Sequence, residues 1–165
     1  MTTPPPGALQ AEANSAATGD IPDNQVFLVY RSTAPRYRMK YPEGWAQSGS
    51  GQRLTFRDKN NIVRVVVLKG SPAIPGRVRR DLAALKGAHI QGAPQRLTIS
   101  GAPAVKVVYT TLSAPNSVTG KRVTLAVDRY YLSHAGQEAI VDLGTPIGVD
   151  NVDAYRLMIE SFRWR

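Results

Sequence analysis

The sequence predicts an α+β domain, an antiparallel β-sheet flanked by helices, over residues 26–165. Three observations support this class. Apolar and polar residues alternate over several short segments, Gly, Pro and Asn separate these segments, and only two segments show helical spacing. A chain of 165 residues has the usual size of one domain with a single core.

Residues 1–25 differ in composition from the rest. They are rich in Pro, Ala, Gly, Thr and Ser, and they hold Glu12, Asp20 and Asp23 but no Lys or Arg. Their small apolar surface cannot offset the entropy lost on ordering, so we expect a disordered leader or tether. Two origins stay open: a cytoplasmic protein with a flexible N-terminus, or an exported protein whose signal was removed. We expect the exported form.

Strands are predicted where apolar residues recur at every second position. Pro42 ends the first of them, and Asp58-Lys59-Asn60-Asn61 forms the turn of a hairpin. The predicted strands are Tyr37–Tyr41, Arg53–Arg57, Ile62–Leu68, Arg96–Ile99, Ala104–Leu112, Arg122–Leu132 and Glu138–Leu143. Consecutive hairpins of this kind imply an antiparallel sheet, and Ser48-Gly-Ser-Gly51 is expected to be a flexible turn.

Two segments have the spacing of a helix face. After Pro75, residues Gly76–Ala88 place Val78, Leu82 and Leu85 at positions i, i+4 and i+7. Near the C-terminus, Asp150 or Asn151 can cap a second helix. Its apolar residues are Val152, Tyr155, Ile159 and Phe162. We expect the two helices to cover the sheet.

Basic residues dominate the folded part. Three of the 12 acidic residues lie in residues 1–25, so the remainder carries 21 basic and 9 acidic side chains, a net charge of +12. If the apolar residues of the first two predicted strands face the core, their cations share the opposite side wherever these strands are neighbours. The resulting candidate binding patch is Arg36, Arg38, Lys40, Arg53 and Arg57. A solvated sheet face with no binding role is the alternative.

A second basic cluster, Arg77, Arg79 and Arg80, falls in the first turn of the predicted helix, where the helix dipole disfavours positive charge. Either a bound anion or pairing with Asp81, Asp58 or another carboxylate would explain it. Tyr130 and Tyr131 are adjacent on a strand and face opposite sides, so at most one of them is expected in the core.

The sequence shows no catalytic or metal-binding pattern. Without cysteine there is no disulfide, thiolate nucleophile or thiolate metal ligand. His89 and His134 each stand alone, and neither a Gly-x-Ser-x-Gly elbow nor a phosphate-binding glycine loop occurs. The longest apolar runs are strand-sized, well short of a membrane helix. We therefore expect a soluble protein that is not an enzyme and has no cofactor.

Two stretches carry a family resemblance. One is Tyr37-Arg-Met-Lys-Tyr-Pro-Glu-Gly-Trp45, and the other runs from Asp128-Arg-Tyr-Tyr131 through Ala139–Leu143 to Ser161-Phe162-Arg163. In these stretches and in the order of predicted elements, residues 26–165 resemble the PsbP-like family. Its fold is shared by a Ran-binding nuclear-import factor and by the DcrB-type and LpqN-type bacterial proteins.

The resemblance implies an antiparallel sheet sandwiched by helices, used mainly for protein binding or accessory roles in assembly. Bacterial members are often exported and frequently lipid-anchored, although this sequence has no lipobox cysteine. No residue matches a photosystem metal site or the Ran-binding surface. We expect an exported or envelope-tethered accessory protein that binds an unidentified protein through its sheet face and loops. The alternative is a basic domain that binds nucleic acid or anionic membrane surfaces. The oligomeric state is open.

Overall fold

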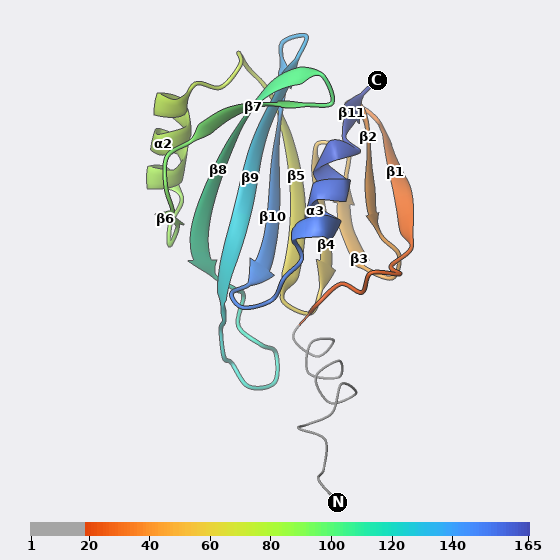
Figure 1. The fold of residues 1–165 in the computed structure, drawn as a ribbon, viewed down its shortest axis with the longest axis vertical. Helices are drawn as coiled ribbons and strands as arrows, with labels where there is room; N and C mark the ends of the chain where they lie inside the picture. The colour runs from red at the N-terminus through yellow and green to blue at the C-terminus, as the bar shows by residue number, and fades with distance from the viewer. Residues whose placement is uncertain (1–18) are drawn as a thin grey trace, which may run out of the picture.

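The structure, a computed structural model, describes residues 19–165 as two β-sheets and two helices (Figure 1). The elements are β1 (Phe27–Thr33), β2 (Arg36–Pro42), β3 (Ala46–Ser50), β4 (Arg53–Asp58), β5 (Asn61–Lys69), α2 (Pro75–Ala84), β6 (His89–Ile90), β7 (Gln95–Ile99), β8 (Ala102–Leu112), β9 (Thr124–His134), β10 (Gln137–Pro146), α3 (Val152–Glu160) and β11 (Arg163–Trp164). The predicted α+β class with an antiparallel sheet and flanking helices is confirmed.

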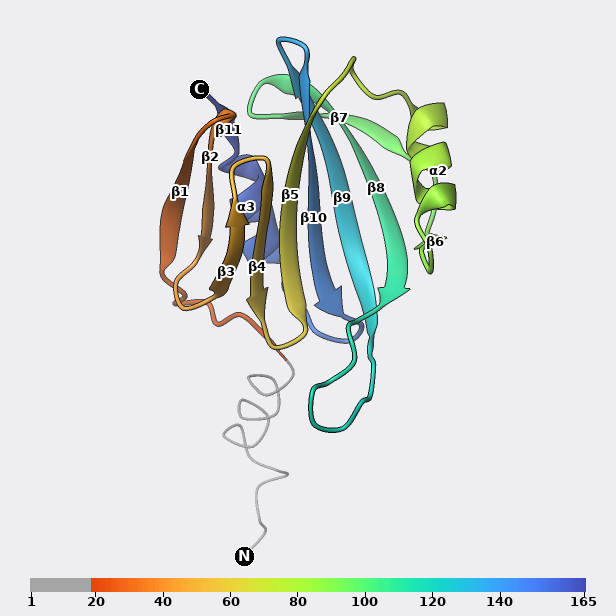
Figure 2. The ribbon, with the colours of Figure 1, turned by 180° about the vertical axis from the view of Figure 1, so that it is seen from behind.

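The larger sheet contains eight strands in the order β3-β4-β5-β10-β9-β8-β6, with β7 also paired to β8. Its strand pairs are antiparallel, and the predicted hairpin of β4 and β5 is present. The chain then leaves the sheet and returns through the meander of β8, β9 and β10. This meander ends with β10 beside β5, where Val141 lies opposite Val65. Figure 2 shows the sheet from behind.

A smaller sheet holds β2 between β1 and β11. The sequence predicted β2 as a strand correctly but did not separate it from the larger sheet. Alternation reveals which residues of a strand are buried, whereas the neighbour of that strand depends on contacts far along the chain. The closing strand, β11, lies more than 100 residues after β2 in the sequence.

Two apolar clusters lie on opposite faces of the larger sheet. The first joins Met39 of β2, Phe56 of β4 and Met158 of α3, all nearly inaccessible to solvent. The second joins Val78 and Leu82 of α2 to β8 and β9. Each element turns its apolar side towards a cluster, because burying that surface is the main favourable term in folding. The small sheet and α3 thus cover one face, and α2 covers part of the other.

Both predicted helices are present, but the first is shorter than expected. It ends at Ala84 instead of Ala88, because Leu85 already has extended backbone angles and the chain turns into β6. The N-cap of α3 is Asn151, whose side chain forms no capping bond, and Oδ1 of Asp150 accepts the N–H of Val152 at 3.1 Å. Within residues 19–165 no helix is long and apolar enough to cross a membrane.

The folded domain begins earlier than the predicted boundary at residue 26. Ile21 belongs to the first apolar cluster, and its N–H donates to Oδ1 of Asn151 at 2.8 Å. The carbonyl of Gly19 accepts hydrogen bonds from the side chains of Asn61 and Asn151. Residues 19–25 are therefore part of the domain, and the rest of the predicted leader, residues 1–18, lies outside the described residues.

The segment Ser48-Gly-Ser-Gly51 is not the flexible turn expected from its composition, because its first three residues belong to the edge strand β3. Its first part pairs with β4, and a Cβ on Gly49 would lie 2.2 Å from the carbonyl oxygen of Arg53. The N–H of Gly51 donates to the hydroxyl of Tyr30, and its carbonyl accepts the hydroxyl of Tyr37 at 2.6 Å. Glycine is needed here because the strands approach more closely than a side chain allows.

Candidate functional site

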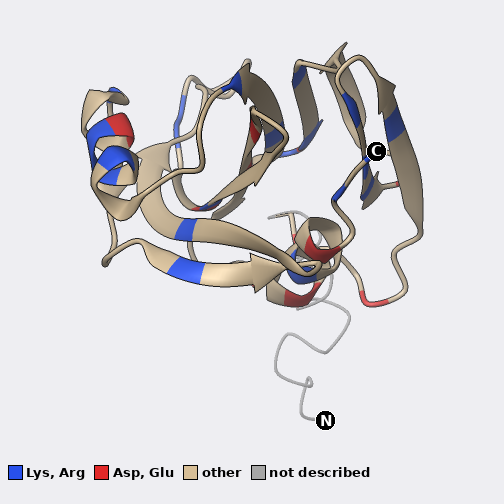
Figure 3. Ribbon diagram, turned by 90° about the horizontal axis from the view of Figure 1, so that it is seen from above, with Lys and Arg blue, Asp and Glu red and all other residues tan. Residues whose placement is uncertain are grey.

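The outer face of the small sheet carries a concentration of cations. Tyr37 and Met39 point inwards and are fully buried, so the alternating residues Arg36, Arg38 and Lys40 point to solvent. The neighbouring strands add Arg31 and Arg163. Figure 3, which colours Lys and Arg blue, shows blue positions along the strands beside the C-terminus. We call the set Arg31, Arg36, Arg38, Lys40 and Arg163 the basic sheet face.

Strand register brings three of these residues into one row. Arg38 lies opposite Arg31 on β1 and opposite Arg163 on β11. Like charges directly opposite each other in a sheet repel and reduce stability. Arg163 is partly compensated, since its Nη1 donates to the carbonyl of Glu160 at the end of α3 and to the carbonyl of Phe162. Among residues 19–165, the other four form no ion pair.

Arg53 and Arg57 do not join this surface, so the predicted five-residue patch is corrected. They lie on β4 in the larger sheet, which does not pair with β2. Both strands bury their apolar sides in the same cluster, and their cations consequently point out of two different sheets. Arg53 and Arg57 instead flank Arg64, which lies opposite Thr55 on β5.

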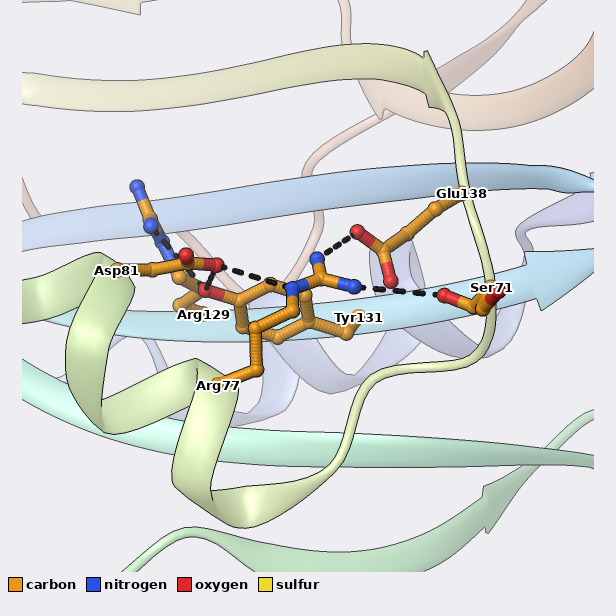
Figure 4. Close-up of polar contacts among 6 residues, drawn as sticks. All are labelled: Ser71, Arg77, Asp81, Arg129, Tyr131 and Glu138. Carbon is orange, nitrogen blue, oxygen red and sulfur yellow. Dashed lines mark hydrogen bonds and ion pairs between the residues drawn. The ribbon is translucent and has the colours of Figure 1, made fainter.

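The second predicted cluster splits within α2. Arg77 pairs with the buried carboxylate of Glu138 and lies 3.6 Å from Asp81 (Figure 4). The hydrogen bond to Glu138 raises the pKa of Arg77. Pairing with carboxylates therefore accounts for Arg77. Arg79 and Arg80 are exposed and form no ion pair among the described residues, so a bound anion stays a prediction for them.

Sequence reasoning missed a buried polar network beneath α2. Arg129 and Asp142 form an ion pair on the sheet. The hydroxyl of Tyr131 donates to Oδ2 of Asp81 at 3.0 Å, which ties the sheet to the helix (Figure 4). Burial raises the pKa of Tyr131 to about 12, so its hydroxyl keeps its proton at neutral pH. The network connects α2 to the sheet.

Tyr130 and Tyr131 correct a further expectation, because both are buried, at 8% and 1% exposure. They do face opposite sides, and they belong to different apolar clusters. The prediction of one core tyrosine assumed a sheet covered on one face only. At β9 the sheet is covered on both faces.

The two histidines remain apart. His134 stacks on Trp164, with ring centroids 6.1 Å apart, while His89 lies on the short strand β6. In the part of the chain that the structure describes, no group of three or more His, Asp or Glu side chains could hold a metal ion.

No protein-family model and no curated protein sequence matches this chain. Solved structures do resemble it. Cyanobacterial PsbP from Synechocystis sp. PCC 6803 matches with a TM-score of 0.63 and 16% identity, over 89% of this chain and 98% of that one. The Ran-binding protein Mog1p of Saccharomyces cerevisiae matches with a TM-score of 0.57 and 9% identity, over 85% of this chain and 96% of that one.

A weaker match is LpqN of Mycobacterium tuberculosis, involved in cell envelope biogenesis, with a TM-score of 0.43 and 16% identity over 85% of this chain and 91% of that one. At sequence identities this low, structural similarity shows the fold alone, and the activity must be argued from the site. The chain adopts the PsbP/Mog1p-like fold that its Tyr-Pro-Glu-Gly-Trp segment and its C-terminal motif indicate.

Proposed function

We propose that this protein is a non-enzymatic accessory or binding protein, and that its basic sheet face and the adjoining loops bind an acidic surface of a partner protein. The observation that carries the proposal is the row of Arg31, Arg38 and Arg163 across the small sheet. Each like-charge pair opposes folding by up to about 1 kcal/mol. Carboxylates of an acidic partner would offset this repulsion, and the fixed positions of the three arginines would define where the partner binds.

The composition of the face favours a protein as the partner. Val29 lies opposite Lys40 and is 44% exposed, so apolar surface is interspersed with the cations. Protein interfaces combine an apolar centre with arginine, whose guanidinium binds carboxylates through two parallel hydrogen bonds. The scaffold is compatible with this role, since one protein of the same fold is described as Ran-binding.

Binding of polyanions, either nucleic acid or an anionic membrane surface, is the second candidate. Its support is that exposed cations also occur away from the small sheet, at Arg53, Arg57, Arg79 and Arg80. Positive electrostatic potential spread over several faces attracts any extended anion, whereas positive potential confined to one face favours a partner with a matching acidic surface. Salt separates the two, because polyanion binding weakens steeply with salt concentration in proportion to the phosphates neutralised.

The test uses immobilised protein comprising residues 1–165, extract from the natural source and washes of increasing salt. One variant carries Arg36→Glu, Arg38→Glu and Lys40→Glu. The control carries Arg53→Glu, Arg57→Glu and Arg79→Glu, with the same change in charge at exposed positions off the face. We expect one specific protein to survive high salt on wild type and control, to be lost from the face variant, and to bind again when purified.

Equal loss from both variants would show that the location of the charge is irrelevant and would overturn the proposal. Retention of nucleic acid or lipid alone, released by moderate salt, would replace it with polyanion binding. Circular dichroism and thermal unfolding of each variant separate loss of binding from loss of fold.

We further propose that the protein is exported or tethered to the cell envelope, with its N-terminal residues serving as the tether. The support is the composition of residues 1–18, which are rich in small residues and Pro and contain no Lys or Arg. A cytoplasmic location is the alternative. Fractionation of cells expressing the natural gene, with protease added to intact spheroplasts, distinguishes the two.

A further inference from the structure

A cavity of about 590 Å³ lies at the β6 end of the larger sheet, away from the small sheet. Its lining comes from the turn after α2, strand β6, the end of β8, and the loop before β9 with the first residue of β9. The polar residues that line it are Lys86, His89, Thr110, Thr111, Arg122 and Thr124. This volume falls in the range of small-molecule sites, about 300–1,000 Å³.

The strand register explains how the lining is assembled. His89 on β6 lies opposite Thr110 on β8, and Leu112 lies opposite Thr124 on β9. Lys86 belongs to the turn that ends α2, just before Gly87, whose φ of +80° turns the chain back towards the sheet. Arg122 lies in the loop before β9, two residues ahead of the strand. Segments far apart in the sequence thus direct cations to one place.

The charges of the lining are of one sign. Lys86 and Arg122 are cationic, the imidazole of His89 is a hydrogen-bond donor, and no Asp or Glu lines the cavity. Among residues 19–165, none of the three basic side chains forms an ion pair. The only hydrogen bond shown for the Arg122 guanidinium is a long one, 3.4 Å, to the carbonyl of Ser113. Its remaining N–H groups have no partner shown in the described part of the chain.

The hydroxyls complete a set of donors. Thr110 accepts a 3.4 Å hydrogen bond from Gln91, which leaves its own O–H free to donate. Thr124 adds a second hydroxyl on the same side of the sheet, because it lies opposite Leu112, two residues after Thr110, whereas the side chain of Thr111 points to the other face. A guanidinium, an ammonium, an imidazole and hydroxyls together match the oxygen atoms of a phosphate group, with the charged donors forming the stronger hydrogen bonds.

The geometry points to a binding site for a phosphate group, carried by a small organic ester. The cavity is larger than a phosphate ion needs, and Leu112, which is 58% exposed, supplies an apolar wall for the rest of the ligand. This site is independent of the basic sheet face, because it lies on the larger sheet, whereas the basic sheet face belongs to the small sheet, and the two share no residue.

The experiment titrates the full chain, labelled with nitrogen-15, with inorganic phosphate, glycerol 3-phosphate, glucose 6-phosphate and glucose at constant ionic strength, followed by backbone amide shifts. The site variant is Lys86→Gln with Arg122→Gln. The control is Arg80→Gln with Lys121→Gln, which removes one Arg and one Lys outside the lining, one of them in the same loop. Thermal unfolding verifies that both variants fold.

We expect saturable shifts around β6, the end of β8 and the start of β9 with the phosphate compounds and none with glucose. The site variant should weaken binding about tenfold or more, and the control should not, because two charge-assisted hydrogen bonds are lost only from the former. If a phosphate ester binds more tightly than inorganic phosphate, the ligand is a phosphate ester. If the two bind equally, the ligand is free phosphate. The absence of saturable shifts, or equal weakening in both variants, would overturn the site.

Discussion

Arg129 and Asp142 lie directly opposite each other on β9 and β10 and form a two-pronged ion pair. Nε to Oδ1 is 2.8 Å, and Nη2 to Oδ2 is 3.0 Å. Both residues are buried, at 9% and 5% exposure. Burial alone would lower the pKa of Arg129, but the hydrogen bond and charge of Asp142 outweigh it, so its pKa is raised. Each charge in this pair therefore depends on the other.

Replacement of one partner should be far more damaging than replacement of both. We expect Arg129→Met to lower the free energy of unfolding by about 3–5 kcal/mol, because Asp142 is left buried without its counter-ion. The double variant Arg129→Met with Asp142→Leu should recover most of that loss. Urea denaturation of the single and double variants measures the coupling, and additive losses would contradict it.

Arg77 should contribute more to stability than the other arginines of α2. Its guanidinium is the one hydrogen-bond donor shown for the Glu138 carboxylate in the described residues, and Oε2 of Glu138 has no partner there. Arg77→Met should cost about 2 kcal/mol, as expected for a lost hydrogen bond to a buried charge.

Arg79→Met and Arg80→Met are the matched controls, because they make the same change on the same helix at exposed positions. Each should change stability by no more than about 0.5 kcal/mol. Chemical denaturation gives all three values. An Arg77 variant as stable as its controls would show that Glu138 obtains its stabilisation from solvent.

Asn151 should hold the N-terminal segment to the domain. Its side chain bonds to Ile21, Gly19 and Thr145. Asn151→Ala should destabilise the fold by about 1–3 kcal/mol, because buried partners lose their hydrogen bonds. It should also speed hydrogen exchange at the Ile21 amide. The neighbouring Asp150→Ala removes only the hydrogen bond to the N–H of Val152 and should leave that exchange unchanged.

Alkaline pH should destabilise the protein through its buried tyrosines. The pKa of Tyr131 is raised from 10.0 to about 12, so the folded state holds its proton more tightly than the unfolded state. Its contribution is fully present below pH 10 and is lost as pH rises towards 12. Burial also raises the pKa of Tyr37, Tyr109 and Tyr155.

Tyr131→Phe should therefore reduce the dependence of unfolding free energy on pH in this range without abolishing it. Urea denaturation at several pH values, with tyrosinate absorbance recorded in parallel, tests this expectation. An unchanged slope would mean that Tyr131 titrates alike in the folded and unfolded protein.

Predictions of local structure were reliable where one side of an element is apolar. The β4–β5 hairpin was predicted from its Asp58-Lys59-Asn60-Asn61 turn, and α3 from its apolar spacing. Strand β3 was not predicted, because all five of its residues are exposed and carry no alternation. An edge strand of this kind is defined by its hydrogen bonds to a neighbour, which composition does not reveal.

The candidate sites likewise contain residues that could be predicted from the sequence and residues that could not. The exposure of Arg36, Arg38 and Lys40 followed from the burial of the residues between them. Their separation from Arg53 and Arg57, their meeting with Arg31 and Arg163, and the cavity around Lys86 and Arg122 did not follow. Each of these depends on which distant strands pair.

The α+β class, most of the strands, both helices and the side of β2 that faces the core could be predicted from the order of residues alone. These properties arise from the backbone periodicity of a single element, 2 residues per repeat in a strand and 3.6 in a helix. Three features depend on the folded arrangement: the division of the strands into two sheets, the burial of both Tyr130 and Tyr131, and the position of Arg129 opposite Asp142. Such relationships join residues from different elements, and the packing of the whole chain selects them.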